Sequence, residues 1–461
     1  MSVEKNKKVE EQFNDYEATP VPEEVHMSWL SQGAVWIGCG FCLAAISTGG
    51  ILANGLGFKD MILAAILGAV ILTIIAATVG IVGAKTHLSS SMGSRFCFGT
   101  NGARIFGLIL ALSNFGWFAF QADLFGNTVV TLVKETGGPE LPQTLFTVLG
   151  ALAMMLTAIV GYKGIKMLSN IAVPLLFLLS IVAVGLTLKQ VPFSEIVSSG
   201  PVETAIPLTV GVAAVVGNFA VGVTIVSDFT RYSKKPKDSV IGCLLGYFIG
   251  YLPILFLGAL FTYAFQNWNI VEVMISKLGL GIIAAIVLIL AQWTTNDNNL
   301  YSSVLGLSNA INGRFPYVRW KLTLIVGLVS TVISAIGVQK YYMNFLTILT
   351  STIPAVAGVI ASDFFILNKK GYDFGLIRDN KLPNWKWNAM IAWGMAALVG
   401  LTMSNPPTGF GVTFMVKLSE TVPIPVVGIS VAFIANCILY PVFNKKLSLI
   451  HISEPTRRTP I

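Results

Sequence analysis

The sequence predicts an all-α integral membrane protein with twelve transmembrane helices. Its 461 residues are 54% hydrophobic and only 11% charged, with a mean hydropathy of +0.75, whereas ordinary soluble domains carry about 25% charged residues. Apolar runs long enough to enter a bilayer recur along the chain, so we expect one integral unit rather than several soluble domains. The predicted spans cover residues 30–53, 61–84, 104–132, 142–161, 168–188, 206–226, 239–265, 279–303, 322–338, 345–366, 387–403 and 424–443.

The positive charges lie mostly on one side of these spans. If the N-terminus faces the cytoplasm, 24 of the 30 lysines and arginines lie in cytoplasmic segments and 6 lie outside. The positive-inside rule therefore predicts that both termini are cytoplasmic. This distribution also accounts for the net charge of +8 without a nucleic-acid partner.

The two ends of the chain differ from its apolar middle. Residues 1–27 are charged, show no signal peptide and predict a cytoplasmic tail, whereas residues 28–447 are expected to form the transmembrane domain. Residues 448–461 include SLIHISEPTR, which looks like a translated sequencing adapter. We therefore expect this tail to be non-native and the natural C-terminus to be truncated near residue 447. The five cysteines and three histidines are scattered, without metal-site or disulfide spacing.

Helix breakers and polar residues interrupt the first and sixth spans. The first contains WIGCGFCLAAISTGG (36–50), and the sixth contains VGVAAVVGNFAVGVTIVSDF (210–229), which includes Asn218. In lipid, a broken helix persists only where it faces protein or a watery cavity. Paired interruptions are typical of an inverted repeat of five plus five helices, with binding sites at the breaks. The alternative is that the glycines only permit close helix packing, which we favour for GCLLGYFIG (242–250).

The third span carries an indole and two amides on one helical face. Asn114, Trp117 and Gln121 recur at three- and four-residue spacing, so their side chains share a face. A flat heterocycle can stack on the indole, while amides can pair with its donors and acceptors. The alternative is an interhelical hydrogen-bond network around a packed tryptophan.

The eighth span ends its apolar run in WTTNDNNLY (293–301). The hydroxyls of Thr294 and Thr295 and the carbonyl of Ala291 can converge on one point of this helix. Together with carbonyls freed in the first span, they predict a sodium site of neutral oxygens, since calcium and magnesium prefer carboxylates. The alternative is that the hydroxyls simply bond back to the helix carbonyl. Asn296 lies one residue further round and could face a substrate, whereas Asp297 could pair with a polar group or cap the following segment.

These segments resemble the cytosine permeases. The likeness is carried by WTTNDNNLY, FGWF in the third span, VVGNFAVGVTIVSDFTRY in the sixth and IPAVAGVIASDFF in the tenth. It covers residues 28–445 and implies the nucleobase–cation symport family, of the purine-cytosine permease type. The implied fold is the leucine-transporter type of five-plus-five inverted repeat, followed by two additional C-terminal helices. The implied location is a bacterial inner membrane.

The resemblance also implies residue roles. Trp117 and Phe219 would stack on either side of the base, and the Asn296 amide would face it. We count Asn114, Gln121 and Asn218 among the expected substrate-binding residues. The implied sodium ligands are the carbonyls of Gly38, Phe41 and Ala291 and the hydroxyls of Thr294 and Thr295.

Five positions depart from the cytosine-permease pattern. Asn114 replaces a glutamine, and Asn218 and Val221 each replace a serine. Gln121 adds an amide that hydantoin- and allantoin-type relatives carry. Asp123 places a carboxylate inside a span, which costs about 2.5–3.5 kcal/mol at the bilayer centre and makes it a functional candidate. The alternative is that Asp123 pairs with a neighbouring group or sits near the outer interface.

We therefore expect sodium-coupled import of cytosine or a close nucleobase. The substrate is not changed chemically, so the protein is expected not to be an enzyme and to need no cofactor beyond sodium as coupling ion. No obligate protein partner is expected. Alternative cargoes are a purine, allantoin or hydantoin, or hydroxymethylpyrimidine, and proton coupling through Asp123 is an alternative to sodium. A membrane-embedded enzyme or channel is disfavoured, because the predicted spans contain no histidine and their acids lie far apart.

Overall fold

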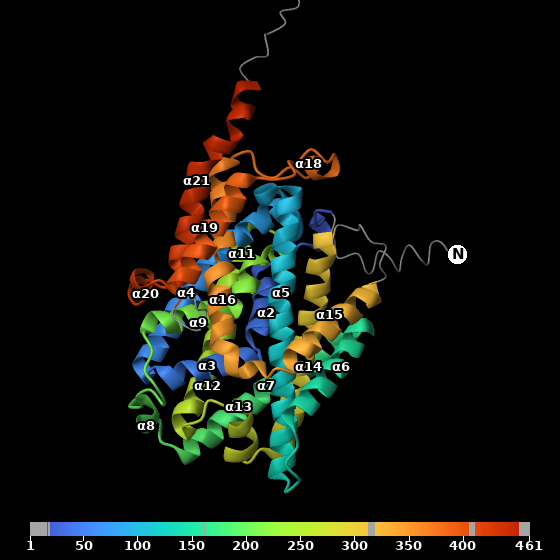
Figure 1. Ribbon diagram of the computed structural model, residues 1–461. Coiled ribbons are helices and arrows are strands. Elements are labelled where there is room, and N and C mark those ends of the chain that lie inside the picture. Colours follow the sequence, from blue (N-terminus) through green and yellow to red (C-terminus); the bar gives the residue numbers. More distant parts are fainter. Residues whose placement is uncertain (1–15, 17–18, 161, 312–318, 405–410, 451–461) are drawn as a thin grey trace, which may run out of the picture.

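The computed structural model describes residues 16, 19–160, 162–311, 319–404 and 411–450, and these are almost entirely helical (Figure 1). The helices before the seventh predicted span are η1 (Glu23–Val25), α2 (Trp29–Gly40), α3 (Leu43–Gly55), α4 (Phe58–Thr86), α5 (Ser90–Glu135), α6 (Gln143–Val160), α7 (Tyr162–Gln190), α8 (Phe193–Val197), α9 (Leu208–Thr224) and α10 (Ser227–Thr230). The later helices are α11 (Pro236–Leu245), η2 (Gly246–Tyr251), α12 (Leu252–Phe265), α13 (Ile270–Glu272), η3 (Val273–Lys277), α14 (Gly281–Ile311), α15 (Arg319–Ser334), η4 (Val338–Tyr341), α16 (Tyr342–Thr352), α17 (Ala355–Ala361), η5 (Ser362–Leu367), α18 (Phe374–Arg378), α19 (Trp387–Met403), α20 (Thr413–Ser419) and α21 (Ile424–Ile450).

Each predicted span coincides with one helix or with consecutive helices. In chain order they lie on α2–α3, α4, α5, α6, α7, α9, α11–η2–α12, α14, α15, η4–α16–α17–η5, α19 and α21. Among the described residues, six helical stretches are long and apolar enough to cross a membrane unaided, and the pair α2 and α3, bent by 59°, would be a seventh. The all-helical membrane architecture is therefore confirmed, while the count of twelve crossings stays a prediction. The six stretches are Phe58–Thr86, Ser90–Glu135, Ile171–Gln190, Pro236–Phe265, Val338–Leu367 and Ile424–Phe443.

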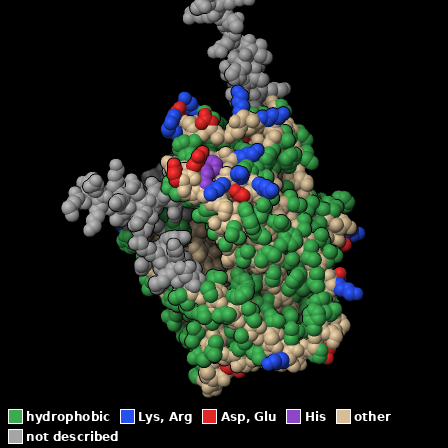
Figure 2. Space-filling view, turned by 180° about the vertical axis from the view of Figure 1, so that it is seen from behind, with side chains coloured by type: hydrophobic (Ala, Val, Ile, Leu, Met, Phe, Trp, Pro, Cys, Tyr) green, Lys and Arg blue, Asp and Glu red, His purple; other side chains and the backbone are tan. Residues whose placement is uncertain are grey.

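Helix α5, which is kinked at Gly99 (φ +80°), runs between two groups of helices (Figure 1). It packs extensively against α14 and α6 on one side, while α16, α19 and α21 pack together on the other. The face shown in Figure 2 is mostly hydrophobic, and its charged side chains gather mainly toward one end. Large apolar side chains such as Ile74, Leu112 and Val332 are more than half exposed, as expected for helices that face lipid.

The first span is broken, as predicted. Helix α2 ends at Gly40, and Phe41 and Cys42 leave the helical conformation before α3 begins. The glycines that follow serve a different purpose, because a Cβ atom on Gly49 would lie 1.9 Å from the carbonyl oxygen of Leu255. Gly49 thus lets α3 and α12 approach closely.

The helix of the sixth span continues past its glycines and ends only after them. Helix α9 runs unbroken to Thr224, and the chain departs from it at Ile225 before the short α10. A Cβ atom on Gly217 would lie 2.5 Å from the carbonyl oxygen of Leu346 in α16. The interruption expected within 210–229 therefore lies at Ile225, and at Gly217 the packing alternative accounts for the glycine.

The small-residue face of the seventh span packs as predicted. It lies against α2, where the side chains would otherwise collide. A Cβ atom would lie 2.9 Å from Gln32 Cβ at Gly242, 2.5 Å from Trp36 Cβ at Gly246 and 2.7 Å from Ile37 Cα at Gly250. This pattern joins two helices rather than forming a binding site.

The predicted terminal tails lie largely outside the described residues. Of the N-terminal tail, residue 16 and residues 19–27 are described, and the C-terminal tail is described only as far as Ile450. The N–H of Val21 bonds to the carbonyl of His87, and Met27 forms a β-bridge with Ser233. The described part of the N-terminal tail is therefore attached to the loops that follow α4 and α10.

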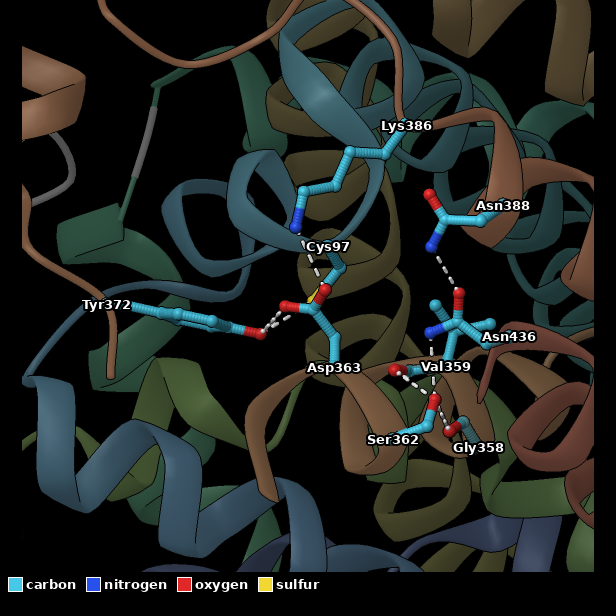
Figure 3. Close-up of polar contacts among 9 residues, drawn as sticks. All are labelled: Cys97, Gly358, Val359, Ser362, Asp363, Tyr372, Lys386, Asn388 and Asn436. Atoms are coloured by element: carbon cyan, nitrogen blue, oxygen red, sulfur yellow. Dashed lines mark hydrogen bonds and ion pairs between the residues drawn. The ribbon is translucent and has the colours of Figure 1, made fainter. Parts of the chain in front are cut away.

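A buried ion pair anchors the end of the tenth span (Figure 3). Asp363 in η5 accepts a 2.9 Å bond from Lys386 Nζ, just before α19, and another of 2.9 Å from the Tyr372 hydroxyl. The Asp363 side chain is completely buried. Beside it, a series of side-chain hydrogen bonds joins α19, α21 and η5 through Asn388, Asn436 and Ser362.

Candidate substrate and ion site

Four aromatic rings from the third and tenth spans form one cluster. The Trp117 ring lies edge-on to Phe345 at 5.1 Å and to Tyr342 at 6.2 Å, measured between centroids. Phe120, one turn further along α5, stacks on Tyr342 at 4.2 Å with 16° between the ring planes. Trp117 keeps only 8% of its surface exposed, so α5 and α16 present a buried aromatic wall.

A polar cluster adjoins this wall at Tyr342. The Asn218 amide of α9 donates to Thr48 Oγ1 of α3 and to the Tyr342 hydroxyl, each at 2.9 Å. Thr48 and the Tyr342 hydroxyl are also 2.9 Å apart, and both donate to the carbonyl of Ala44. The Asn218 Oδ1 atom is buried without a hydrogen-bond partner. Side chains from the first, third, sixth and tenth spans therefore meet at one place.

The two amides predicted on α5 are both buried but differ in their partners. Asn114 Nδ2 donates 2.9 Å back to the carbonyl of Leu110 on its own helix. Gln121 is completely buried, and neither its nitrogen nor its oxygen has a partner. Thr128, two turns beyond Gln121, accepts a 2.9 Å bond from Gln292 of α14, so this stripe of α5 faces α14. An unpaired buried amide is costly, which makes Gln121 the freer of the two to bind a ligand.

Phe219 belongs to a second aromatic cluster. Its ring is partly buried and lies 4.6 Å from Tyr251 and 5.8 Å from Tyr247, both edge-on. Trp117 contacts neither of these tyrosine rings among the described ring pairs. The two clusters are joined through α9, because Asn218 immediately precedes Phe219. A stack with Trp117 on one face and Phe219 on the other stays a prediction.

The predicted oxygen set of the eighth span converges. The Thr294 hydroxyl lies 3.0 Å and the Thr295 hydroxyl 2.9 Å from the carbonyl oxygen of Ala291. This geometry suits the simple back-bonding alternative, and it leaves lone pairs of both hydroxyl oxygens available for a cation. The three predicted oxygens therefore lie together, and the sodium site stays a prediction.

Asn296 turns away toward α6. Its side chain is completely buried, and Nδ2 lies 3.1 Å from the sulfur of Met154. Its Oδ1 atom has no partner. The amide that we expected to face the substrate therefore faces a neighbouring helix in this arrangement.

The first-span carbonyls lie at the α2–α3 break. The Gly38 carbonyl accepts a 3.3 Å bond from the N–H of Phe41. The Phe41 ring lies 5.6 Å from Phe177 of α7. Both rings line a cavity of about 240 Å³ whose other walls are mainly aliphatic residues of α7 and α12. Phe177 is half exposed, so this cavity lies at the apolar surface of the protein.

The two acids singled out in the spans have hydrogen-bond partners. Asp123 accepts from Gln143, Thr147 and the backbone N–H of Gln339. Asp297 accepts from the Thr157 hydroxyl at 2.9 Å through one oxygen and 3.1 Å through the other. Asp297 therefore pairs with a polar group of α6, one of the two roles that its sequence left open.

Sequence reasoning missed four residues of the central cluster: Thr48, Phe120, Tyr342 and Phe345. Tyr342 lies before the predicted tenth span, and its hydroxyl meets Thr48 across 294 residues of chain. Local spacing carries no signal for such a pair. The aromatic residues at 341, 342 and 345 were the available hint.

Comparison with known proteins identifies the family. Residues 20–423 match the family described as permease for cytosine/purines, uracil, thiamine, allantoin. The chain belongs to this permease family. It is 31% identical over 408 residues to the cytosine permease of Escherichia coli strain K12, covering 88% of this chain and 94% of that protein. It is 23% identical over 363 residues to the hydantoin permease of Microbacterium maritypicum, covering 74% and 73%.

Solved transporters share the fold. Mhp1, a nucleobase-cation-symport-1 family transporter in a closed conformation with bromovinylhydantoin bound, superposes with a TM-score of 0.76 at 18% identity, over 93% of this chain and 96% of that chain. A Na⁺-coupled sialic acid symporter in a substrate-bound outward-open state gives 0.59 at 14% identity, over 90% of each chain. The predicted family is confirmed, and this permease is a multi-pass membrane transporter rather than an enzyme.

Proposed function

We propose that this permease imports cytosine or a closely related nucleobase across the bacterial inner membrane, coupled to sodium, by alternating access. The observation that carries the proposal is the convergence of Trp117, Tyr342 and Asn218 from three spans. It provides an aromatic face beside an amide with an unused oxygen, in a chain of the nucleobase permease family. No protein partner and no nucleic acid is required for this activity.

The base lies against Trp117, with Phe219 on its other face. Buried amide atoms without partners stabilise a bound ligand, because the ligand removes the penalty of leaving them unpaired. Asn218 Oδ1 and both polar atoms of Gln121 are such groups. Asn114 and Asn296 complete the proposed set of substrate-binding residues once their amides turn toward the base.

Sodium binds between the first and eighth spans. Its proposed ligands are neutral oxygens, which a small monovalent cation accepts. They are the carbonyls of Gly38, Phe41 and Ala291 and the hydroxyls of Thr294 and Thr295. The short bonds of the two hydroxyls to Ala291 support a preformed half of this site.

Coupling follows from shared preference for one state. Sodium and the base each bind the same conformation more tightly than the other. This difference is required, because a ligand with equal affinity for two conformations does not shift the equilibrium between them. In this proposal twelve spans cross the membrane with both termini in the cytoplasm. The first ten form the five-plus-five inverted repeat, and the last two are additional C-terminal helices.

A different heterocycle is the main alternative cargo. Gln121 is buried with both polar atoms unpaired, and the amides at 114, 121 and 218 enlarge the hydrogen-bonding capacity of the pocket. The alternative cargoes have either more hydrogen-bond donors and acceptors than cytosine or a different arrangement of them. They are purines, allantoin, hydantoin and hydroxymethylpyrimidine. The test adds each unlabelled compound in excess and measures how far it reduces uptake of labelled cytosine. If excess unlabelled cytosine does not reduce this uptake, cytosine is excluded as the cargo.

Thr295→Ala is expected to reduce sodium stimulation of uptake strongly and to shift it to about tenfold higher sodium concentration. Loss of one hydroxyl ligand weakens sodium binding, by about tenfold if it is worth one charge-assisted contact. The measurement is radiolabelled cytosine uptake into proteoliposomes, with and without an inward sodium gradient.

Thr295→Ser is the matched control, because it keeps the hydroxyl and should keep sodium stimulation. Wild-type uptake that ignores sodium but follows a pH gradient would contradict the sodium site. No uptake by folded protein would mean that the cargo differs.

A further inference from the structure

Asp123 is a buried carboxylate held by three donors from two other elements. Only 2% of its surface is exposed. Its Oδ1 accepts from Gln143 Nε2 at 2.8 Å and from the Thr147 hydroxyl at 3.4 Å. Its Oδ2 accepts from the backbone N–H of Gln339 at 3.0 Å. The carboxylate therefore joins α5, the first turn of α6 and the 3₁₀ helix η4.

The contact with Gln339 differs from the other two. Gln143 and Thr147 lie on α6, which packs along α5. Gln339 lies in η4, which starts after a turn at Gly337 with φ +77° and leads directly into α16. A movement of the start of the tenth span relative to α5 would break the Gln339 bond and leave the α6 bonds intact.

The short segment after Gln339 carries the central tyrosine. Tyr342 lies three residues further on, where its ring stacks on Phe120 and its hydroxyl meets Asn218. A 3₁₀ turn fixes this separation, so the position of Gln339 sets the position of Tyr342. Phe345, the edge-on neighbour of Trp117, follows on the next turn.

We infer that Asp123 is a positioning residue that holds the start of the tenth span, and with it Tyr342, against the base pocket. The inference rests on the proposed function for its effect on uptake. A hydrogen bond from a backbone N–H to a carboxylate is among the stronger ones, and a buried one is not weakened by water. Because the backbone N–H of Gln339 can only donate, Asp123 acts toward it as a hydrogen-bond acceptor, and this contact is not a proton relay.

Asp123→Leu tests this by removing the acceptor while keeping side-chain size. All three hydrogen bonds to Asp123 are lost, and we expect the KM for labelled cytosine to rise about tenfold through the loss of the one that holds Gln339, with Vmax within about twofold of the wild type. Apparent affinity falls because the binding-competent arrangement is less populated. Asp123→Asn should rescue KM to within about threefold, because its amide oxygen can accept from Gln339 while Gln143 and Thr147 turn to accept from its NH₂ group.

A second pair of variants removes the donor instead. Gln339→Pro deletes the N–H, in the first turn of a helix where proline is tolerated, and should raise KM as Asp123→Leu does. Gln339→Ala keeps the N–H and should leave KM unchanged, since Gln339 Nε2 has no partner. Equal KM values for the proline and alanine variants would overturn the inference. So would an Asp123→Asn protein as defective as Asp123→Leu, which is the result expected of a proton carrier.

Hydrogen–deuterium exchange supplies a readout that needs no substrate. The amides of residues 338–342 should exchange about tenfold faster in Asp123→Leu than in the wild type, because their anchor is lost. Unchanged exchange in this segment would overturn the inference. If wild-type protein takes up no cytosine but the exchange difference is seen, the proposed cargo fails and the positioning role of Asp123 stands.

Discussion

Lys386→Met is expected to destabilise the folded protein by about 3–5 kcal/mol, because it leaves a buried carboxylate without its cation. Asp363 is fully buried, and its bond to Lys386 Nζ measures 2.9 Å. The Tyr372 hydroxyl remains as a donor but carries no charge. Methionine preserves most of the apolar stem, so the loss is electrostatic rather than a loss of packing. The measurement is the thermal unfolding midpoint of the purified protein in detergent, together with its folded yield.

Two controls separate this effect from the general loss of a lysine. Lys381→Met removes one of the two cationic partners of Asp379, at 3.0 Å, and leaves Arg378 at 3.2 Å. All three side chains are exposed, so Tm should not change. Adding Asp363→Asn to Lys386→Met should recover much of the lost stability, because removing both charges of a buried pair is often nearly neutral. A Lys386→Met protein that unfolds at the wild-type temperature would show that water or another group replaces the lysine.

The helical architecture was readable from the sequence because it depends on local composition. Apolar runs predicted helices at every span, and the small residues of 242–250 predicted close packing, which Gly246 against Trp36 confirms. A break within 36–50 was also predicted, and the structure places it at Phe41 and Cys42. The glycines of 210–229 did not show where the sixth span breaks, because a glycine that interrupts a helix and one that admits a neighbouring backbone look alike in sequence. Tertiary contact alone distinguishes them.

Only part of the candidate site could be predicted from the sequence. Residues that share one helix, such as Asn114 with Gln121 or Ala291 with Thr295, were placed correctly relative to one another because helical periodicity fixes their geometry. The partners of Asn218 were not, since Thr48 lies 170 residues and Tyr342 124 residues away along the chain. Asp123 shows the same limit. Its carboxylate had two open readings, and Gln339, 216 residues away, now favours the structural one.

Trp117→Ala is expected to raise the dissociation constant for the base at least about tenfold. An aromatic pair contributes about 0.5–1.5 kcal/mol beyond the apolar area it buries, and the indole supplies both terms. The indole also packs edge-on against Phe345 at 5.1 Å, so its loss lets the wall formed by α5 and α16 relax. The measurement is equilibrium binding of labelled cytosine to purified, folded protein, with Tm recorded for each variant.

The stability cost of this substitution must be separated from its effect on binding. Phe118 is the matched control, because it is fully buried beside Trp117 in sequence but packs in a different apolar cluster, between α5, α6, α14 and α15. Phe118→Ala creates a cavity that costs about 3–5 kcal/mol, yet the folded fraction should bind the base normally. Trp117→Phe keeps an aromatic face and should weaken binding by only about threefold. If Phe118→Ala weakens binding as much as Trp117→Ala, then α5 supports the pocket through its overall packing, and the indole is not the surface on which the base stacks.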